Sequence, residues 1–126
     1  AANAMLDIIA DDGLCERAAK IGEKIKGRLV AISKRQGMEA IGDVRGLGAM
    51  IAFEMVKSRE TGEPDAALTA AIVAQSEQRG LIILPCGTRS NVVRLLPPLN
   101  TSDVVVDEAL DVLEASIEAA ITQSQI

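Results

Sequence analysis

The sequence lacks several residue types that carry recognisable chemistry. It contains no histidine, tryptophan or tyrosine, and Phe53 is its one aromatic residue. With a single aromatic ring, which the core needs, the chain has no set of platforms on which nucleic-acid bases could stack. The formal net charge of −5 also repels phosphate backbones and anionic membrane surfaces. We therefore expect no nucleic-acid partner and no membrane partner.

Cysteine is scarce as well. The two cysteines, Cys15 and Cys86, lie far apart in the sequence. Because there is no histidine, they match no zinc or iron–sulfur ligand spacing and no cysteine–histidine nucleophile. We expect both to be buried structural thiols, and we expect no metal site.

Long apolar runs are also missing. No run approaches the roughly 18 to 20 residues that span a bilayer, and the first residues carry no basic segment of the kind that opens a secretory signal. These absences predict a cytoplasmic location. The sequence does not begin with methionine and opens in the middle of a helical pattern. We therefore expect a piece of a longer polypeptide.

The residues that are present favour a single folded domain. An apolar fraction of 48% over 126 residues is enough for one core of ordinary size, and that core must be aliphatic. No internal repeat, low-complexity tract or linker divides the chain. We expect residues 1–126 to form one domain.

Helical patterns occupy the first part of the chain. Residues 1–10 have a helical pattern that is interrupted at residues 11–13, where Asp-Asp-Gly offers an N-cap for a new helix. The new helix should run to about Arg35 and stop before Gly37. Its apolar residues recur at steps of three and four, which is typical of an amphipathic helix. They are Leu14, Ala18, Ile21, Ile25, Leu29 and Ile32.

Two further helices are predicted nearer the C-terminus. Asp65 can cap a helix over residues 66–79, and Thr101 or Ser102 can cap the last helix. The last helix has its own apolar stripe at helical spacing. The stripe consists of Val106, Leu110, Leu113, Ile117 and Ile121.

Two pairs of strands lie between these helices. Residues 41–45 and 49–56 should form a hairpin, because the Gly-Leu-Gly sequence between them supplies the freedom that a tight reversal needs. Residues 81–84 form a continuous apolar strand pattern, and residues 92–96 form another that ends at two prolines. A loop over residues 85–90 joins this second pair.

The predicted order of elements is α-β-β-α-β-β-α. It predicts an α/β fold, more closely an α+β sandwich, in which helices pack on a small, mainly antiparallel sheet.

Arg94 is the main candidate for a functional residue. It lies within residues 91–99, NVVRLLPPL, a run that otherwise has the character of a buried or half-buried strand. Burying a guanidinium is costly unless an anion meets it, and its planar five-donor fork matches a carboxylate. Arg94 is therefore either half of a structural ion pair or a receptor for an acidic ligand, and spacing alone leaves both open.

Other motifs have simpler interpretations. The two glycines of residues 46–48 lack the third glycine and the helix start of a phosphate-binding loop, so they indicate a turn. Cys86 has no histidine to act as its base, which favours a structural thiol. Glu54 falls on the solvated face of an alternating strand. The three lysines of residues 20–26 are interleaved with Glu16 and Glu23 and indicate a solvated helix face.

Three segments together resemble a known family. They are residues 44–50 (VRGLGAM), 80–87 (GLIILPCG) and 91–99 (NVVRLLPPL), with residues 14–18 and 61–64 adding to the likeness. They resemble the C-terminal small domain of class III, fold-type I, pyridoxal-phosphate-dependent aminotransferases, most of all the branch that acts on 4-aminobutyrate. The likeness runs from about Ala1 to Ala120.

The resemblance implies an activity for the parent protein. It implies transfer of the amino group of 4-aminobutyrate to 2-oxoglutarate, which gives succinate semialdehyde and glutamate, in a homodimer or larger homo-oligomer. Arg94 would bind the α-carboxylate of glutamate or 2-oxoglutarate. When 4-aminobutyrate is bound, the family pairs this arginine with a glutamate of the large domain.

The resemblance also implies what this chain lacks. The cofactor, pyridoxal 5'-phosphate, would be held by a lysine, an aspartate and a phosphate-binding loop of the large domain, outside this sequence. We therefore expect no catalytic and no cofactor-binding residue in residues 1–126, and no activity from this chain alone.

Two alternatives remain open. One is another class III ω-aminotransferase, of the acetylornithine or ornithine type, which would keep the same arginine for 2-oxoglutarate. The other is a stand-alone regulatory module in which two ββα units bind an amino acid at a dimer interface.

Overall fold

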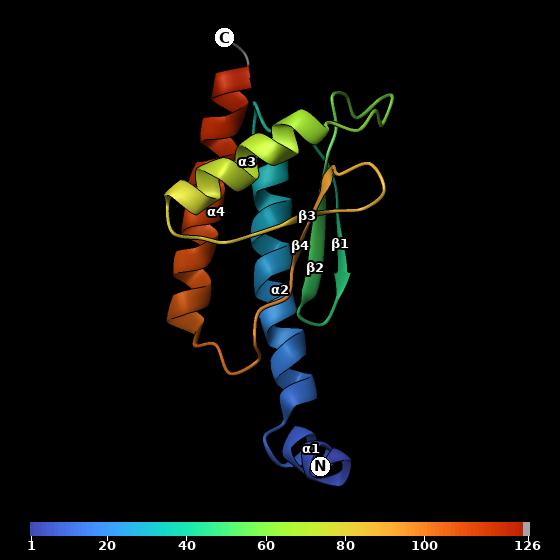
Figure 1. Cartoon of the computed structure of the whole chain (residues 1–126), viewed down its shortest axis with the longest axis vertical. Coiled ribbons are helices and arrows are strands. Elements are labelled where there is room, and N and C mark those ends of the chain that lie inside the picture. The colour runs from blue at the N-terminus through green and yellow to red at the C-terminus, as the bar shows by residue number, and fades with distance from the viewer. Residues whose placement is uncertain (125–126) are drawn as a thin grey trace.

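A computed structural model of the chain describes residues 1–124 (Figure 1). Four helices and four strands occur in this range. In chain order they are α1 (Ala2–Asp11), α2 (Leu14–Ser33), β1 (Ile41–Leu47), β2 (Met50–Met55), α3 (Ala66–Gln78), β3 (Pro85–Cys86), β4 (Val92–Leu95) and α4 (Asp103–Ser124). The predicted order of helices and strands is confirmed, with α1 as the short opening helix.

The sheet is antiparallel throughout and has the strand order β1-β2-β4-β3. β1 and β2 form the predicted hairpin, whose turn consists of Gly48 and Ala49. Gly48 has a φ of +55°, a left-handed conformation that favours glycine. The register places Ala52 of β2 opposite Arg45 of β1 on one side and opposite Arg94 of β4 on the other.

Helices cover one face of this sheet. Ile51, Phe53 and Met55 of β2 are at most 1% exposed, whereas the residues between them are half-buried. Figure 1 shows α2 between the sheet and α4, with α3 packed across α4. One core of Phe53 and aliphatic side chains fills the space between helices and sheet, as the composition predicted.

The opposite face of the sheet carries no helix among residues 1–124. We call it the open face. Successive residues of a strand point to opposite faces, and this alternation places the apolar Leu47, Met50 and Val92 on the open face. The other outward side chains of the hairpin and of β4 are polar or small. They are Asp43, Arg45, Ala52, Glu54 and Arg94.

The two predicted apolar stripes are largely buried. In α2 the first two stripe residues, Leu14 and Ala18, are half-buried. The buried members are Ile21, Ile25, Leu29 and Ile32 in α2 and Val106, Leu110, Leu113, Ile117 and Ile121 in α4.

The helix caps follow the sequence, and in two cases a side chain provides the cap. The carboxylate of Asp65 accepts a hydrogen bond from the backbone N–H of Leu68 at 2.9 Å, so the predicted cap of α3 is confirmed. For α4, Ser102 Oγ accepts from the N–H of Val105 at 3.5 Å. The N-cap of α2 falls within the predicted segment 11–13, but it is Gly13, so no side chain caps that helix.

The predicted strand over residues 81–84 is wrong. These residues are not part of the sheet, and β3 is the short segment Pro85–Cys86, which we had assigned to a loop. The physical reason lies in β4, the neighbour of β3. β4 ends at Leu95, and the following Pro97 and Pro98 have no N–H to continue a ladder, so residues 81 and 82 have no strand residue opposite them. Ile83 and Leu84 fall opposite Leu95 and Arg94 in the register, but the two segments separate there around a groove.

Neither cysteine is buried, so the prediction of two buried thiols is wrong. Cys15 is exposed and Cys86 is half-buried. Cys15 lies in the first turn of α2, at the end of the helix that adjoins α1 and extends beyond the end of the sheet in Figure 1. Cys86 lies in the edge strand β3, which is covered on one side only.

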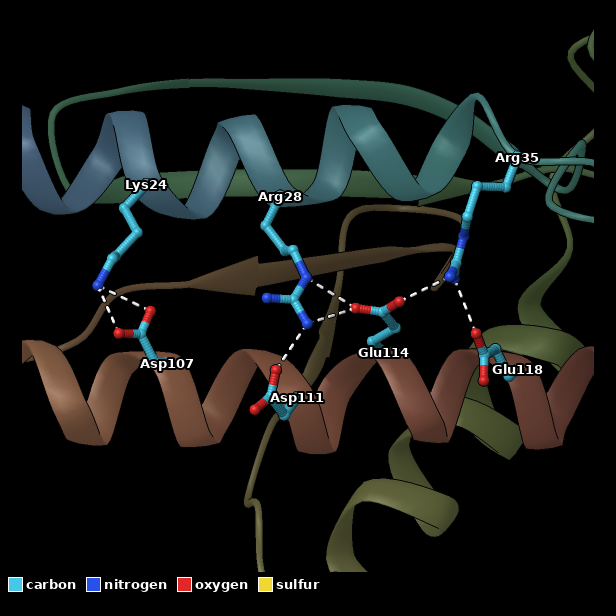
Figure 2. A network of polar contacts seen from close by, with 7 residues as sticks. All are labelled: Lys24, Arg28, Arg35, Asp107, Asp111, Glu114 and Glu118. Carbon is cyan, nitrogen blue, oxygen red and sulfur yellow. Dashed lines mark hydrogen bonds and ion pairs between the residues drawn. The ribbon is translucent and has the colours of Figure 1, made fainter.

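A network of ion pairs joins α2 to α4 (Figure 2). Lys24 contacts Asp107 at 2.7 Å, so this lysine faces a helix rather than solvent alone, while Lys20 and Lys26 are exposed as predicted. Further along, Arg28 and Arg35 both contact Glu114, at 2.6 and 2.7 Å. The sequence interpretation missed this network, although its members recur on one face of each helix.

No helix within residues 1–124 combines the length and the apolar character that crossing a bilayer requires.

Candidate carboxylate-binding site

Arg94 lies in the middle of β4, on the open face of the sheet. Val93 beside it is fully buried against the helices, and the strand alternation therefore places Arg94 on the other side. The guanidinium-bearing residue is exposed. The sequence predicted the strand around Arg94 correctly. The cost of burying a guanidinium, from which its role was argued, does not arise within this chain because Arg94 is exposed.

A second arginine, Arg45, lies on the same face and has two carboxylate partners. Its guanidinium contacts Asp43 at 2.8 Å and Glu54 at 2.6 Å. Asp43 first and Glu54 second, through the hydrogen bonds that they accept, raise the pKa of Arg45 above its ordinary value. Arg45 thus already has two carboxylate partners within this chain.

Arg94 differs from Arg45 in this respect. Within residues 1–124, no carboxylate oxygen lies within 4.0 Å of a nitrogen of Arg94. Of the two alternatives that the sequence left open, the structural ion pair is therefore not formed in the part of the chain that the structure describes. Ala52, opposite Arg94, contributes only a methyl group and leaves the guanidinium uncovered from β2.

The sequence placed Glu54 on a solvated strand face, and the structure confirms that position with a side chain that is 31% exposed. Its pairing with Arg45 was not predicted. The period of two along each strand and the two-residue turn together fix the register of the hairpin, so the sequence did contain the signal that brings these residues together.

An apolar groove of about 650 Å³ borders Arg94. It lies between residues 81–86 and 94–98, which separate where the sheet ends, and the first half of α4 closes it on the helix side. Ile82, Leu84 and Leu96 are 83%, 71% and 63% exposed at or beside this groove. Arg94 therefore lies beside an apolar surface that water does not favour.

The described residues do not fit a pyridoxal phosphate site. Such a site needs a lysine beside the substrate position, and no lysine belongs to β1, β2, β3 or β4. Three lysines lie on α2, Lys34 follows its end, and Lys57 is held by Glu63 at 2.6 Å in the loop after β2.

Comparison with known proteins identifies the family. The family described as Aminotransferase class-III matches residues 1–117. The chain is 47% identical over 113 residues to 4-aminobutyrate aminotransferase of Mycobacterium leprae, covering 90% of this chain and 25% of the relative. It is 40% identical over 114 residues to 5-aminovalerate aminotransferase of Pseudomonas putida, covering 90% of this chain and 26% of the relative.

Solved structures agree with the sequence comparison. An aminotransferase of Bacillus anthracis superposes with a TM-score of 0.80 at 29% identity, over 90% of this chain and 26% of that protein. The family match and the fold shared with a solved aminotransferase together define this chain as an aminotransferase domain. The chain belongs to the class-III aminotransferases and spans about a quarter of the length of the relatives that it matches.

Proposed function

We propose that residues 1–126 form the C-terminal small domain of a longer class III transaminase and bind the carboxylate of its acidic substrate. The single observation that supports this most is the contrast on the open face. Arg45 is neutralised by two carboxylates, whereas Arg94, on the same face and opposite the same alanine, has no carboxylate partner within residues 1–124.

We propose 4-aminobutyrate and 2-oxoglutarate as the substrates of the whole enzyme. Similarity to a protein named 4-aminobutyrate aminotransferase supports this choice, and so does the acidic second substrate that Arg94 suits. Pyridoxal 5'-phosphate, on which class III aminotransferases depend in general, would supply the electron sink when it is bound by residues outside this chain.

The contribution of Arg94 in this proposal is substrate orientation. Its guanidinium donates two parallel hydrogen bonds to the α-carboxylate of 2-oxoglutarate or glutamate, which fixes the adjacent carbon in reactive geometry. A substrate without this carboxylate leaves the charge unpaired and is disfavoured. The domain therefore contributes specificity.

A homo-oligomer is part of the same proposal. All residues of α1 are exposed, and Met5 and Leu6 are 57% and 64% exposed. Apolar surface of this extent on a helix supports packing against other parts of an assembly.

One alternative keeps the arginine but changes the amino donor. The relative named 5-aminovalerate aminotransferase matches the chain almost as well, which supports another ω-amino acid as donor. A stand-alone amino-acid-binding module is the second alternative, and it predicts that the chain is not followed or preceded by a transaminase large domain in its gene.

The test is substitution of Arg94 by lysine in the full-length protein. A point charge replaces a bidentate fork, so we expect the KM for 2-oxoglutarate to rise by about tenfold or more. The effect on the 4-aminobutyrate half-reaction should be smaller, because that substrate has no α-carboxylate.

Arg45→Lys is the matched control. Arg45 occupies the equivalent position opposite Ala52, keeps its charge in this variant and is already neutralised, so the KM for 2-oxoglutarate should stay within about twofold of the unsubstituted enzyme. An unchanged KM in Arg94→Lys would remove Arg94 from the substrate site.

A further inference from the structure

A buried asparagine lies at the start of the strand that carries Arg94. Asn91 is 7% exposed, directly precedes β4 and stands three residues before Arg94. Because it is two residues from Val93, it shares the helix-covered side of the sheet, where an apolar side chain is expected. A buried amide in such a position needs a specific partner. The other buried polar side chains of residues 1–124 lie on helices and are Thr69, Ser76 and Ser116.

The amide of Asn91 joins β4 to β2. Asn91 Nδ2 donates a hydrogen bond to the backbone carbonyl of Met55 at 3.1 Å, and the N–H of Met55 donates to the carbonyl of Asn91 at 2.8 Å. Met55 is the last residue of β2 and is fully buried. Both hydrogen bonds require Asn91 to lie opposite Met55, so together they mark one alignment of the two strands.

The rest of β4 fixes its register less strictly. The strand has four residues, and Val93 is the fully buried one among them. A shift by one residue would turn Arg94 into the core, which the cost of burying an unpaired guanidinium forbids. A shift by two residues would put Leu95 in the place of Val93, so an apolar side chain would still face the core. The apolar pattern alone therefore leaves two alignments open.

The two alignments differ in where Arg94 lies. In the observed register Arg94 is opposite Ala52, and a shift by two residues would move it about 7 Å along β2 while keeping it on the open face. A bidentate hydrogen bond to a carboxylate tolerates far less than such a displacement. The register of β4 therefore determines whether the guanidinium meets the substrate.

We propose that Asn91 is a positioning residue whose buried amide fixes the register of β4 on β2, and with it the place at which Arg94 meets the substrate carboxylate. This rests on the proposed function of Arg94. The apolar side chains of β4 hold the strand on the sheet, and the amide selects its alignment. A single buried asparagine selects the register of coiled coils in the same way.

The test is Asn91→Leu in the full-length protein, which keeps the approximate size of the side chain and removes the amide. The carbonyl of Met55 keeps a partner in this variant, because it also accepts from the N–H of Asp65 at 3.0 Å. We expect the KM for 2-oxoglutarate to rise about tenfold and the half-reaction with 4-aminobutyrate to change by less than about twofold. A loss of folded protein alone would slow both half-reactions alike and leave the KM unchanged.

A double variant tests whether Asn91 acts through Arg94. In the Arg94→Lys background, Asn91→Leu should raise the KM by less than about twofold, because a single flexible ammonium depends less on register than a planar fork. Effects that multiply independently would overturn the proposal. Ser116→Ala is the matched control, because it removes a buried hydroxyl that donates to the carbonyl of Val112 at 2.7 Å within α4, and it should leave this KM unchanged.

Asn91→Ala covers the case in which Asn91→Leu does not fold, since it removes the amide without adding an apolar side chain, and the same rise in KM is expected. Failure of both variants to fold would overturn the proposal, because Asn91 would then be required for the fold as a whole. A raised KM in Arg94→Lys with an unchanged KM in Asn91→Leu overturns the role of Asn91 and leaves that of Arg94. An unchanged KM in Arg94→Lys overturns both.

Discussion

Three arginines of this chain have different partners, and these partners decide what each arginine can do. Arg59 donates hydrogen bonds to the backbone carbonyls of Ile41 at 2.9 Å, Ser33 at 2.6 Å and Met38 at 3.2 Å, so it ties the end of α2 to the start of β1. Arg45 pairs with two carboxylates, and Arg94 has no carboxylate partner within residues 1–124. The ligand-binding role that we propose for Arg94 rests on this difference in surroundings.

Asp103 at the start of α4 provides a prediction about pH. The hydrogen bond from Arg17 at 2.6 Å, followed by its charge, lowers the pKa of Asp103 below its ordinary value near 3.8. A carboxyl with a lowered folded-state pKa stabilises the fold at pH above its ordinary pKa, and this contribution is lost as pH falls through the folded-state pKa. Arg17→Met should therefore raise the pKa of Asp103 and reduce the loss of stability on acidification.

The measurement is an NMR titration of the Asp103 carboxyl in the two proteins. Lys20→Met is the control, because Lys20 lowers the same pKa only through its charge and is the smallest cause. An equal shift in Lys20→Met and Arg17→Met would show that the hydrogen bond is not the dominant cause.

Single residues differed in how well the sequence predicted them. Arg94 was identified because a charge in an apolar run demands an explanation, and Glu54 was placed correctly by alternation. The cysteines were predicted from composition, which carries no information on where α2 extends past the sheet or on which strand lies at the edge. Their exposure depends on tertiary position.

At the scale of elements, the packing of α2 against α4 combines apolar stripes with the network of Figure 2. Glu114 is its centre: its carboxylate forms ion pairs with both Arg28 and Arg35, and its side chain is 18% exposed, the lowest value among the acidic members. Glu114 first and Asp111 second raise the pKa of Arg28. Networks with a partly buried centre contribute more than isolated surface pairs.

Glu114→Gln should therefore destabilise the fold more than the removal of a peripheral charge. We expect a loss of about 1 to 2 kcal/mol in the free energy of unfolding, since two guanidinium groups lose a charged acceptor. Asp107→Asn, whose aspartate is 53% exposed and contacts one lysine, should cost about 0.5 kcal/mol or less. Urea unfolding measures both, and equal losses would contradict the central position of Glu114.

The helices were predictable because their stripes extend over several turns, and the hairpin because glycine marks its turn. Residues 81–84 were not predictable in the same way. Their side chains alternate between exposed and buried positions from Leu81 to Leu84 as in a strand. Whether such a segment joins a sheet depends on where it separates from its neighbour β4, which is not written in the segment itself.

At the scale of the whole molecule, the open face, the groove and α1 leave apolar and charged surface uncovered in this chain. The family resemblance could be found from the sequence, because residues 44–50, 80–87 and 91–99 carry it and the class-III match covers residues 1–117. Cofactor chemistry could not be located, since no strand of the described sheet carries a lysine.

The isolated chain should therefore form no specific adduct with pyridoxal phosphate. Lys34 and Lys57 lie in polar surroundings, and an ammonium in such surroundings is a poor nucleophile. Incubation of the chain with equimolar pyridoxal phosphate, borohydride reduction and peptide mapping measure this. One lysine labelled to full stoichiometry would contradict the proposal that the cofactor site lies outside residues 1–126.

The central claim is that Arg94 receives the carboxylate of the acidic substrate. The most direct measurement is a crystal structure of the full-length protein with 2-oxoglutarate bound. We predict that both oxygens of one ligand carboxylate lie about 2.7 to 2.9 Å from two guanidinium nitrogens of Arg94, on the open face of the sheet. A ligand whose carboxylates are held by other side chains, with Arg94 facing away from it, would contradict this claim.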